Sequence, residues 1–95
     1  MREIEIKIKD KPVTGLEIKL YKANLVLVKA PKGFVSCGYL DLNTAEKFSD
    51  AACLVCGVTS IEDLLKAKIT GLTSLAAALG IKIGMTGQEA LELML

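Results

Sequence analysis

The chain has 95 residues, of which 52% are hydrophobic and 4% aromatic, and its net charge is +1. This length predicts a single domain over residues 1–95, near the lower limit for a self-sufficient core, and the near-neutral charge argues against a general nucleic-acid binder. Because the apolar content exceeds what so small an interior easily holds, we expect a homo-oligomer, with a tightly packed monomer as the alternative.

The first predicted elements are two amphipathic β-strands. Residues 2–9 alternate isoleucine with charged residues, which indicates a strand buried on one side. A turn is expected at residues 10–12. The next strand, residues 13–21, has a bulge predicted at Thr14-Gly15 and carries on one face Leu16, Ile18 and Leu20.

Two further strands complete the first half. Residues 24–30 (NLVLVKA) are apolar on both faces, so this strand should be central in its sheet. A tight turn at residues 31–33 leads to a fourth strand over residues 34–40. Since all connections are short, the four strands are expected to form an antiparallel meander.

The second half reads as helices with one or two short strands. Asn43 or Thr44 can cap a short helix whose inward residues are Ala45 and Phe48. Residues 51–56 (AACLVC) are apolar on both faces and predict another strand. Residues 68–70 can add a further short strand.

Three more helices are expected after that strand. Ser60 caps the first, whose apolar stripe is Ile61, Leu64 and Leu65. The second covers residues 72–79 and ends at Gly80, and it should bury Leu72, Leu75, Ala76 and Leu79. Residues 86–89 (TGQE) form a capping box for the last helix, which carries Ala90, Leu91 and Met94. We therefore predict an α+β fold, an antiparallel meander followed by α-β-α(-β)-α packed mainly on one face, with a mixed sheet as an open alternative.

Several segments resemble a known family. They are CGYL (37–40), AEKF-D (45–50) and GMTGQEAL (84–91), and the similarity extends from about residue 15 to residue 94. In this order and spacing they resemble the YunC-like family of small uncharacterised bacterial and archaeal proteins. The resemblance implies a compact α+β domain with no assigned biochemical role and no catalytic residue to transfer.

Cys53 and Cys56 have the CxxC spacing of half a zinc site or of a redox motif. Zinc needs four ligands, but only Cys37 remains and the chain has no histidine. A thioredoxin-like pair should begin a helix, whereas this pair lies within an apolar run. We therefore expect neither metal nor cofactor, and we interpret both as packed, slowly reacting thiols.

The GxxG at residues 84–87 has the spacing of the nucleic-acid clamp of KH domains. It lacks the basic residues of such a clamp, so we interpret it as a turn that leads into a capped helix.

Cys37 is the strongest candidate for a functional thiol. It lies between Ser36 and Gly38, whose small size admits a ligand, and Tyr39 shares its strand face. We expect it to be the most accessible of the three cysteines. With no histidine in the chain, Tyr39 or Asp41 would have to assist it as a base.

Our leading hypothesis is a cytoplasmic, non-catalytic domain that self-associates and binds a small molecule or a protein partner. An odd number of cysteines without a signal peptide favours the cytoplasm, and no segment is long and apolar enough to span a membrane. The alternative is a thiol-dependent enzyme that uses Cys37, so whether the chain is an enzyme stays open. No nucleic-acid or membrane partner is expected.

Overall fold

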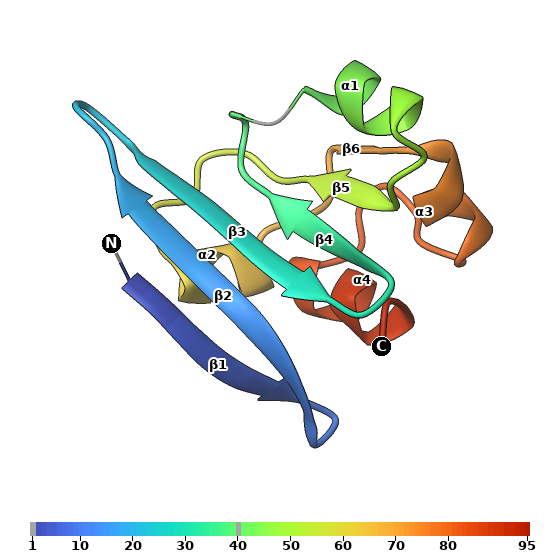
Figure 1. The fold of residues 1–95 in the computed structure, drawn as a ribbon, viewed down its shortest axis with the longest axis horizontal. Coiled ribbons are helices and arrows are strands. Elements are labelled where there is room, and N and C mark those ends of the chain that lie inside the picture. Colours follow the sequence, from blue (N-terminus) through green and yellow to red (C-terminus); the bar gives the residue numbers. More distant parts are fainter. Residues whose placement is uncertain (1, 40) are drawn as a thin grey trace.

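The computed structural model describes residues 2–39 and 41–95, and it is built on one six-stranded sheet in the order β1-β2-β3-β4-β5-β6 (Figure 1). The strands are β1 (Arg2–Ile8), β2 (Lys11–Lys19), β3 (Asn24–Ala30), β4 (Gly33–Ser36), β5 (Ala52–Leu54) and β6 (Gly71–Leu72). The helices are α1 (Leu42–Lys47), α2 (Ile61–Lys66), α3 (Ser74–Ala78) and α4 (Gly87–Leu93). The predicted α+β fold is confirmed.

Strands β1 to β4 form the predicted antiparallel meander. The first turn lies one residue earlier than expected, because Lys9 and Asp10 both adopt positive φ angles, 51° and 65°, and Lys11 already pairs with Ile8. Left-handed backbone at both central positions is typical of a two-residue hairpin, whose twist matches that of the strands.

The predicted bulge at Thr14-Gly15 is wrong. The pairing of β2 with both neighbours passes through these residues without interruption. Gly15 has a different role: a Cβ at this position would lie 2.8 Å from Cδ1 of Ile61, so the glycine makes room for α2 against the sheet.

The sheet is mixed, because β4 and β5 are parallel while every other neighbouring pair is antiparallel. Both strands are shorter than predicted. Strand β4 ends at Ser36 rather than continuing to residue 40, which itself lies outside the described residues. Strand β5 covers only Ala52–Leu54 of the apolar run 51–56. A small sixth strand does exist, but at residues 71–72 rather than 68–70, where only Lys68 forms an isolated bridge.

The helix caps largely follow the prediction. Ser60 caps α2, and Thr86 and Glu89 form the expected capping box of α4. Helix α1 instead begins after Asp41, whose side chain accepts a hydrogen bond from the Asn43 N–H at 3.0 Å. Its Ala45 is buried as predicted, whereas Phe48 is 73% exposed because the helix has ended by that residue.

Helix α3 is shorter than predicted. It is capped by Thr73 and spans Ser74–Ala78. Ala76 is buried, but Leu75 lies exposed at the edge of the sheet. The backbone at Gly80, with φ of 95°, turns the chain after this helix as expected.

The helices cover the two faces of the sheet unequally. In Figure 1, α2 and α4 lie behind the sheet, and their buried residues pack on β1–β4 and help form a core with Val26, Val28, Val35, Ile61, Leu64, Leu91 and Met94. Helix α1 lies on the opposite face at the β5–β6 end, since a Cβ at Gly71 would meet Cδ1 of Leu42. We call the side of β1, β2 and β3 that points away from α2 and α4 the open face.

Candidate functional site

The open face carries four apolar side chains at its centre. Cross-strand partners share one face of a sheet, so the pairs Leu16–Leu27 and Ile18–Leu25 lie side by side across β2 and β3. All four are only half-buried, although they belong to long central strands. We call Leu16, Ile18, Leu25 and Leu27 the apolar patch.

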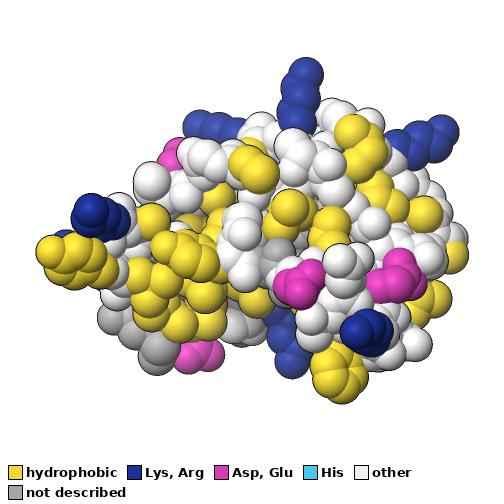
Figure 2. Space-filling model, turned by 90° about the horizontal axis from the view of Figure 1, so that it is seen from above, with side chains coloured by type: hydrophobic (Ala, Val, Ile, Leu, Met, Phe, Trp, Pro, Cys, Tyr) yellow, Lys and Arg dark blue, Asp and Glu magenta, His cyan; other side chains and the backbone are white. Residues whose placement is uncertain are grey.

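Three of the patch residues lie outside the main core. The core cluster and the hydrophobic side chains packed against it include Ile4, Ile6 and Leu25, but not Leu16, Ile18 or Leu27. The core side of β2 is formed by Val13 and Gly15 instead. Figure 2, a view from above Figure 1, shows hydrophobic side chains gathered toward the end of the molecule where the β2–β3 hairpin projects.

Charged residues flank the apolar patch. On β1, the residues that alternate with the inward isoleucines are Glu3, Glu5 and Lys7, and all three are exposed. On β3, Lys29 pairs with Thr14, which pairs with Glu5 on its other side. The open face therefore carries two carboxylates and one amine along its β1 edge, and the amine of Lys29 lies across Thr14 from Glu5.

The candidate thiol Cys37 is buried, with 4% of its surface exposed. Its Sγ atom accepts a hydrogen bond from the Val26 N–H at 3.4 Å, and its own N–H donates to the Val26 carbonyl oxygen at 3.0 Å. Cys37 and Tyr39 line a hollow of about 390 Å³ between the end of β4 and the loop before α2. The structure thus brings these two candidates together.

Asp41 does not line this hollow. Its two carboxylate oxygens accept hydrogen bonds from the Asn43 N–H and the Thr44 hydroxyl, at 3.0 and 3.1 Å. It serves as a helix cap, which could have been foreseen from its position before the helix.

The prediction about thiol accessibility is wrong for Cys56 and for Cys37. Cys53 is completely buried, and burial raises the pKa of its thiol to about 11. Cys56 is exposed instead of packed, because β5 has ended at Leu54 and the chain turns at Gly57, where φ is 73°. Cys56, not Cys37, is therefore the accessible thiol.

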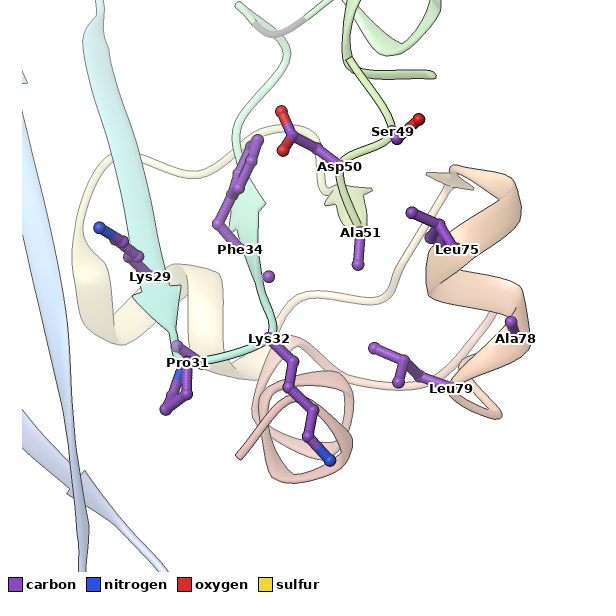
Figure 3. A pocket seen from close by; sticks show the side chains of 12 residues that line it. Lys29, Pro31, Lys32, Phe34, Ser49, Asp50, Ala51, Leu75, Ala78 and Leu79 are labelled. Atoms are coloured by element: carbon purple, nitrogen blue, oxygen red, sulfur yellow. The ribbon is translucent and has the colours of Figure 1, made fainter. Parts of the chain in front are cut away.

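A second hollow, of about 460 Å³, lies between the β3–β4 turn and α3. In Figure 3, Leu75 of α3 and Leu79, the residue that follows α3, face Phe34 and Ala51 across it, and Lys29 lies on the far side of Phe34 from α3. Its lining is mainly apolar, with Asp50 at one end. Such a hollow can hold the apolar part of a small molecule.

Neither a metal site nor a membrane-spanning segment emerges from the described residues. Within residues 2–39 and 41–95, no three cysteine, aspartate or glutamate side chains gather closely enough to hold a metal ion. No helix in the same part of the chain is long and apolar enough to cross a membrane.

Sequence reasoning did not single out the open face. The signal was present, since residues 24–30 are apolar on both faces. However, the two apolar faces predicted only that this strand is central in its sheet. Within residues 2–39 and 41–95, helices cover one side of β3, because α2 and α4 lie together on the core face and α1 packs at the β5–β6 end.

The comparisons with known proteins agree with the resemblance seen in the sequence. Residues 36–94 match the family described as "Domain of unknown function (DUF1805)". The "Uncharacterized protein YunC" of Bacillus subtilis is 37% identical over 94 residues, which cover 95% of this chain and 93% of that protein. The crystal structure of a protein of unknown function from Thermoplasma acidophilum superposes with a TM-score of 0.94 and 30% identity, over 98% of this chain and 91% of that one. This chain therefore belongs to the DUF1805 family.

Proposed function

We propose that this domain is a non-catalytic assembly module that binds a second copy of itself through the open face. The observation that carries this proposal is the apolar patch: four aliphatic side chains on the neighbouring strands β2 and β3 stay only partly buried. Burying an exposed leucine or isoleucine completely is worth about 1.5–3 kcal/mol. Half-buried side chains offer part of that gain, and a symmetric dimer would obtain it from both copies.

Light scattering coupled to size-exclusion chromatography tests this proposal. We expect the wild type to have a dimer mass that falls to the monomer mass on dilution, and Leu16→Glu to be monomeric at every concentration. Leu75→Glu is the matched control, because Leu75 is exposed on α3 away from the patch. A wild-type mass equal to the monomer at millimolar concentration refutes the proposal.

A small-molecule site is a second candidate function, supported by the hollow beside α3. Its volume of about 460 Å³ lies within the range of known ligand pockets. We propose to probe it with the fluorescent apolar anion 8-anilinonaphthalene-1-sulfonate. Loss of the signal in Leu79→Glu but not in Leu16→Glu supports a ligand site in the hollow. The opposite pattern assigns the dye to the open face and contradicts the second candidate.

The thiol-dependent enzyme has less support. A nucleophilic thiol must be reached by its substrate and paired with a base, whereas Cys37 is buried and its sulfur already accepts the Val26 N–H. Rapid alkylation of Cys37 by iodoacetamide in the native protein would favour the enzyme. A cytoplasmic location is part of our proposal, since all three thiols are free, and a disulfide in the native protein would contradict it.

A further inference from the structure

We infer that two copies pack open face to open face about a two-fold axis that runs along β2, so that Glu5 of each copy lies opposite Lys29 of the other. This inference rests on the proposed function and specifies how the two copies are oriented. Three observations carry it: the position of α1, the row of residues that crosses β2, and the charges at its two ends.

Helix α1 sets the position of the axis. It covers the β5–β6 end of the sheet on the side of the open face, and Ser36 on the neighbouring β4 is only 3% exposed. Among the residues that the structure describes, none of the helices covers this side of β1, β2 and β3. A partner sheet that is centred on these three strands has β2 at its middle, and α1 of each copy then projects beyond the β1 edge of the other.

The strand register makes the open face self-complementary about that axis. Thr14 on β2 pairs with Glu5 on β1 and with Lys29 on β3, so the carboxylate and the amine lie in one row on opposite sides of β2. Neighbouring strands are about 4.8 Å apart, which puts both residues at the same distance from the axis. A rotation by 180° about β2 exchanges the two sides, and each Glu5 then faces a Lys29.

The same rotation stacks the apolar patch. Leu16 and Ile18 lie on β2 and would meet their own counterparts on the axis, while Leu25 and Leu27 on β3 lie beside it. Strands related in this way run in the same direction, which agrees with the aligned packing usual for two sheets about 10 Å apart. Glu3 would cover Leu27 of the other copy with the aliphatic part of its side chain.

Both charged groups are available for such contacts. Among the described residues, the ion pairs within one copy involve only Arg2 and Lys9 as cations, and none includes Glu5 or Lys29. Both side chains are exposed in the single chain. Each dimer would gain two intermolecular pairs, which fix the orientation of the copies more than they add affinity.

A charge-reversal experiment tests the orientation. Glu5→Lys and Lys29→Glu should each raise the dimer dissociation constant by about tenfold or more, because each places two like-charged pairs in the dimer. The double variant Glu5→Lys/Lys29→Glu should return it to near the wild-type value. Lys82→Glu, an exposed lysine between α3 and α4, is the matched control and should leave dimerisation unchanged. Circular dichroism and the unfolding midpoint check that every variant is folded.

Mixing the two single variants gives the sharpest readout. In a two-fold dimer with one Glu5→Lys chain and one Lys29→Glu chain, both pairs again join opposite charges, one as in the wild type and one with the signs exchanged. A heterodimer should therefore form where neither variant dimerises well alone. Native mass spectrometry distinguishes it from both homodimers. If Leu16→Glu abolishes the dimer but charge reversal has no effect and mixing gives no heterodimer, the orientation is wrong and the proposed function stands. A wild-type monomer or trimer overturns the inference outright.

Discussion

Replacement of Cys53 by serine tests whether the middle of the sheet is as closed as the structure shows. Cys53 lies in β5 between Val35 of β4 and Leu72 of β6, with none of its surface exposed. Burial alone raises the pKa of its thiol to about 11, so the side chain is an uncharged, weakly polar group at neutral pH. Serine is nearly the same shape but needs a strong hydrogen bond.

The expected loss follows from the missing partner. A buried hydroxyl without a hydrogen bond costs about 1–3 kcal/mol of unfolding free energy. For a domain of this size, 1 kcal/mol lowers the unfolding midpoint by about 4–8 °C, so Cys53→Ser should lower it by about 10 °C. Cys53→Ala, which removes the sulfur without adding a polar atom, should cost less than Cys53→Ser. At Cys37 the sulfur already accepts the Val26 N–H, and a serine oxygen can take over that bond, so Cys37→Ser should cost about half as much as Cys53→Ser.

Urea unfolding followed by circular dichroism measures all three variants at one protein concentration, which keeps any contribution of self-association constant. Cys53→Ser should be the most destabilised variant, and both Cys53→Ala and Cys37→Ser should lose less stability. A Cys53→Ser variant as stable as Cys53→Ala would show that the hydroxyl finds a partner or water. That result would contradict the conclusion that the core around β5 is closed to water and offers the hydroxyl no hydrogen-bond partner.

Three further predictions address the thiols, the α2–α4 contact and the helix cap. In the native protein, iodoacetamide should label Cys56 first and Cys53 last, since Cys56 is exposed and Cys53 is buried with a raised pKa. Mass spectrometry of peptides gives the order of labelling, and early labelling of Cys53 would contradict this prediction. Gly87→Ala should lower the free energy of unfolding by about 1–3 kcal/mol, because its Cβ would overlap the carbonyl oxygen of Leu64. A Cβ at Gly38 would have no atom within 4 Å, so Gly38→Ala should be close to neutral in the same thermal unfolding assay. The N–H of Thr86 donates to the Glu89 carboxylate and lowers its pKa below the ordinary 4.5, so this contact stabilises the fold at neutral pH and the stabilisation is lost as the pH falls through the lowered pKa. Glu89→Gln keeps an acceptor and should reduce the fall in stability between pH 6 and pH 3, and an unchanged pH profile would count against this role.

The sequence was most informative where side-chain alternation and capping chemistry act locally. Isoleucine alternation in β1, the N-cap Ser60 and the capping box at Thr86 fix these elements without reference to the rest of the chain. The errors arose where tertiary contacts decide. Gly15 suggested a bulge from its type alone, but the space it leaves is filled by Ile61, 46 residues later in the chain.

The candidate site was less predictable than the fold. Accessibility of a thiol depends on where a strand stops, and the run 51–56 gave no sign that β5 ends two residues before Cys56. Likewise, the exposure of Leu16 and Leu27 depends on which face of the sheet the helices pack against, and helix periodicity does not predict that face. The pairing register, once known, is what revealed the row Glu5–Thr14–Lys29.

The closing of the core by α4 has a consequence for the order of folding. Ala90, Leu91 and Met94 are fully buried, and the Met94 carbonyl oxygen accepts the N–H of Lys32 from the β3–β4 turn at 2.8 Å. The strands of the meander have mostly local contacts and can pair early. Their core face, however, stays in contact with water until residues 87–94 have packed on it. We therefore expect amide protection in β2 and β3 to appear only when α4 becomes protected in pulsed hydrogen exchange during refolding. During synthesis, a ribosome-bound chain that ends before residue 87 would expose apolar side chains on both faces of the meander instead of one. We therefore expect this nascent meander to be the form of the protein that most needs a chaperone.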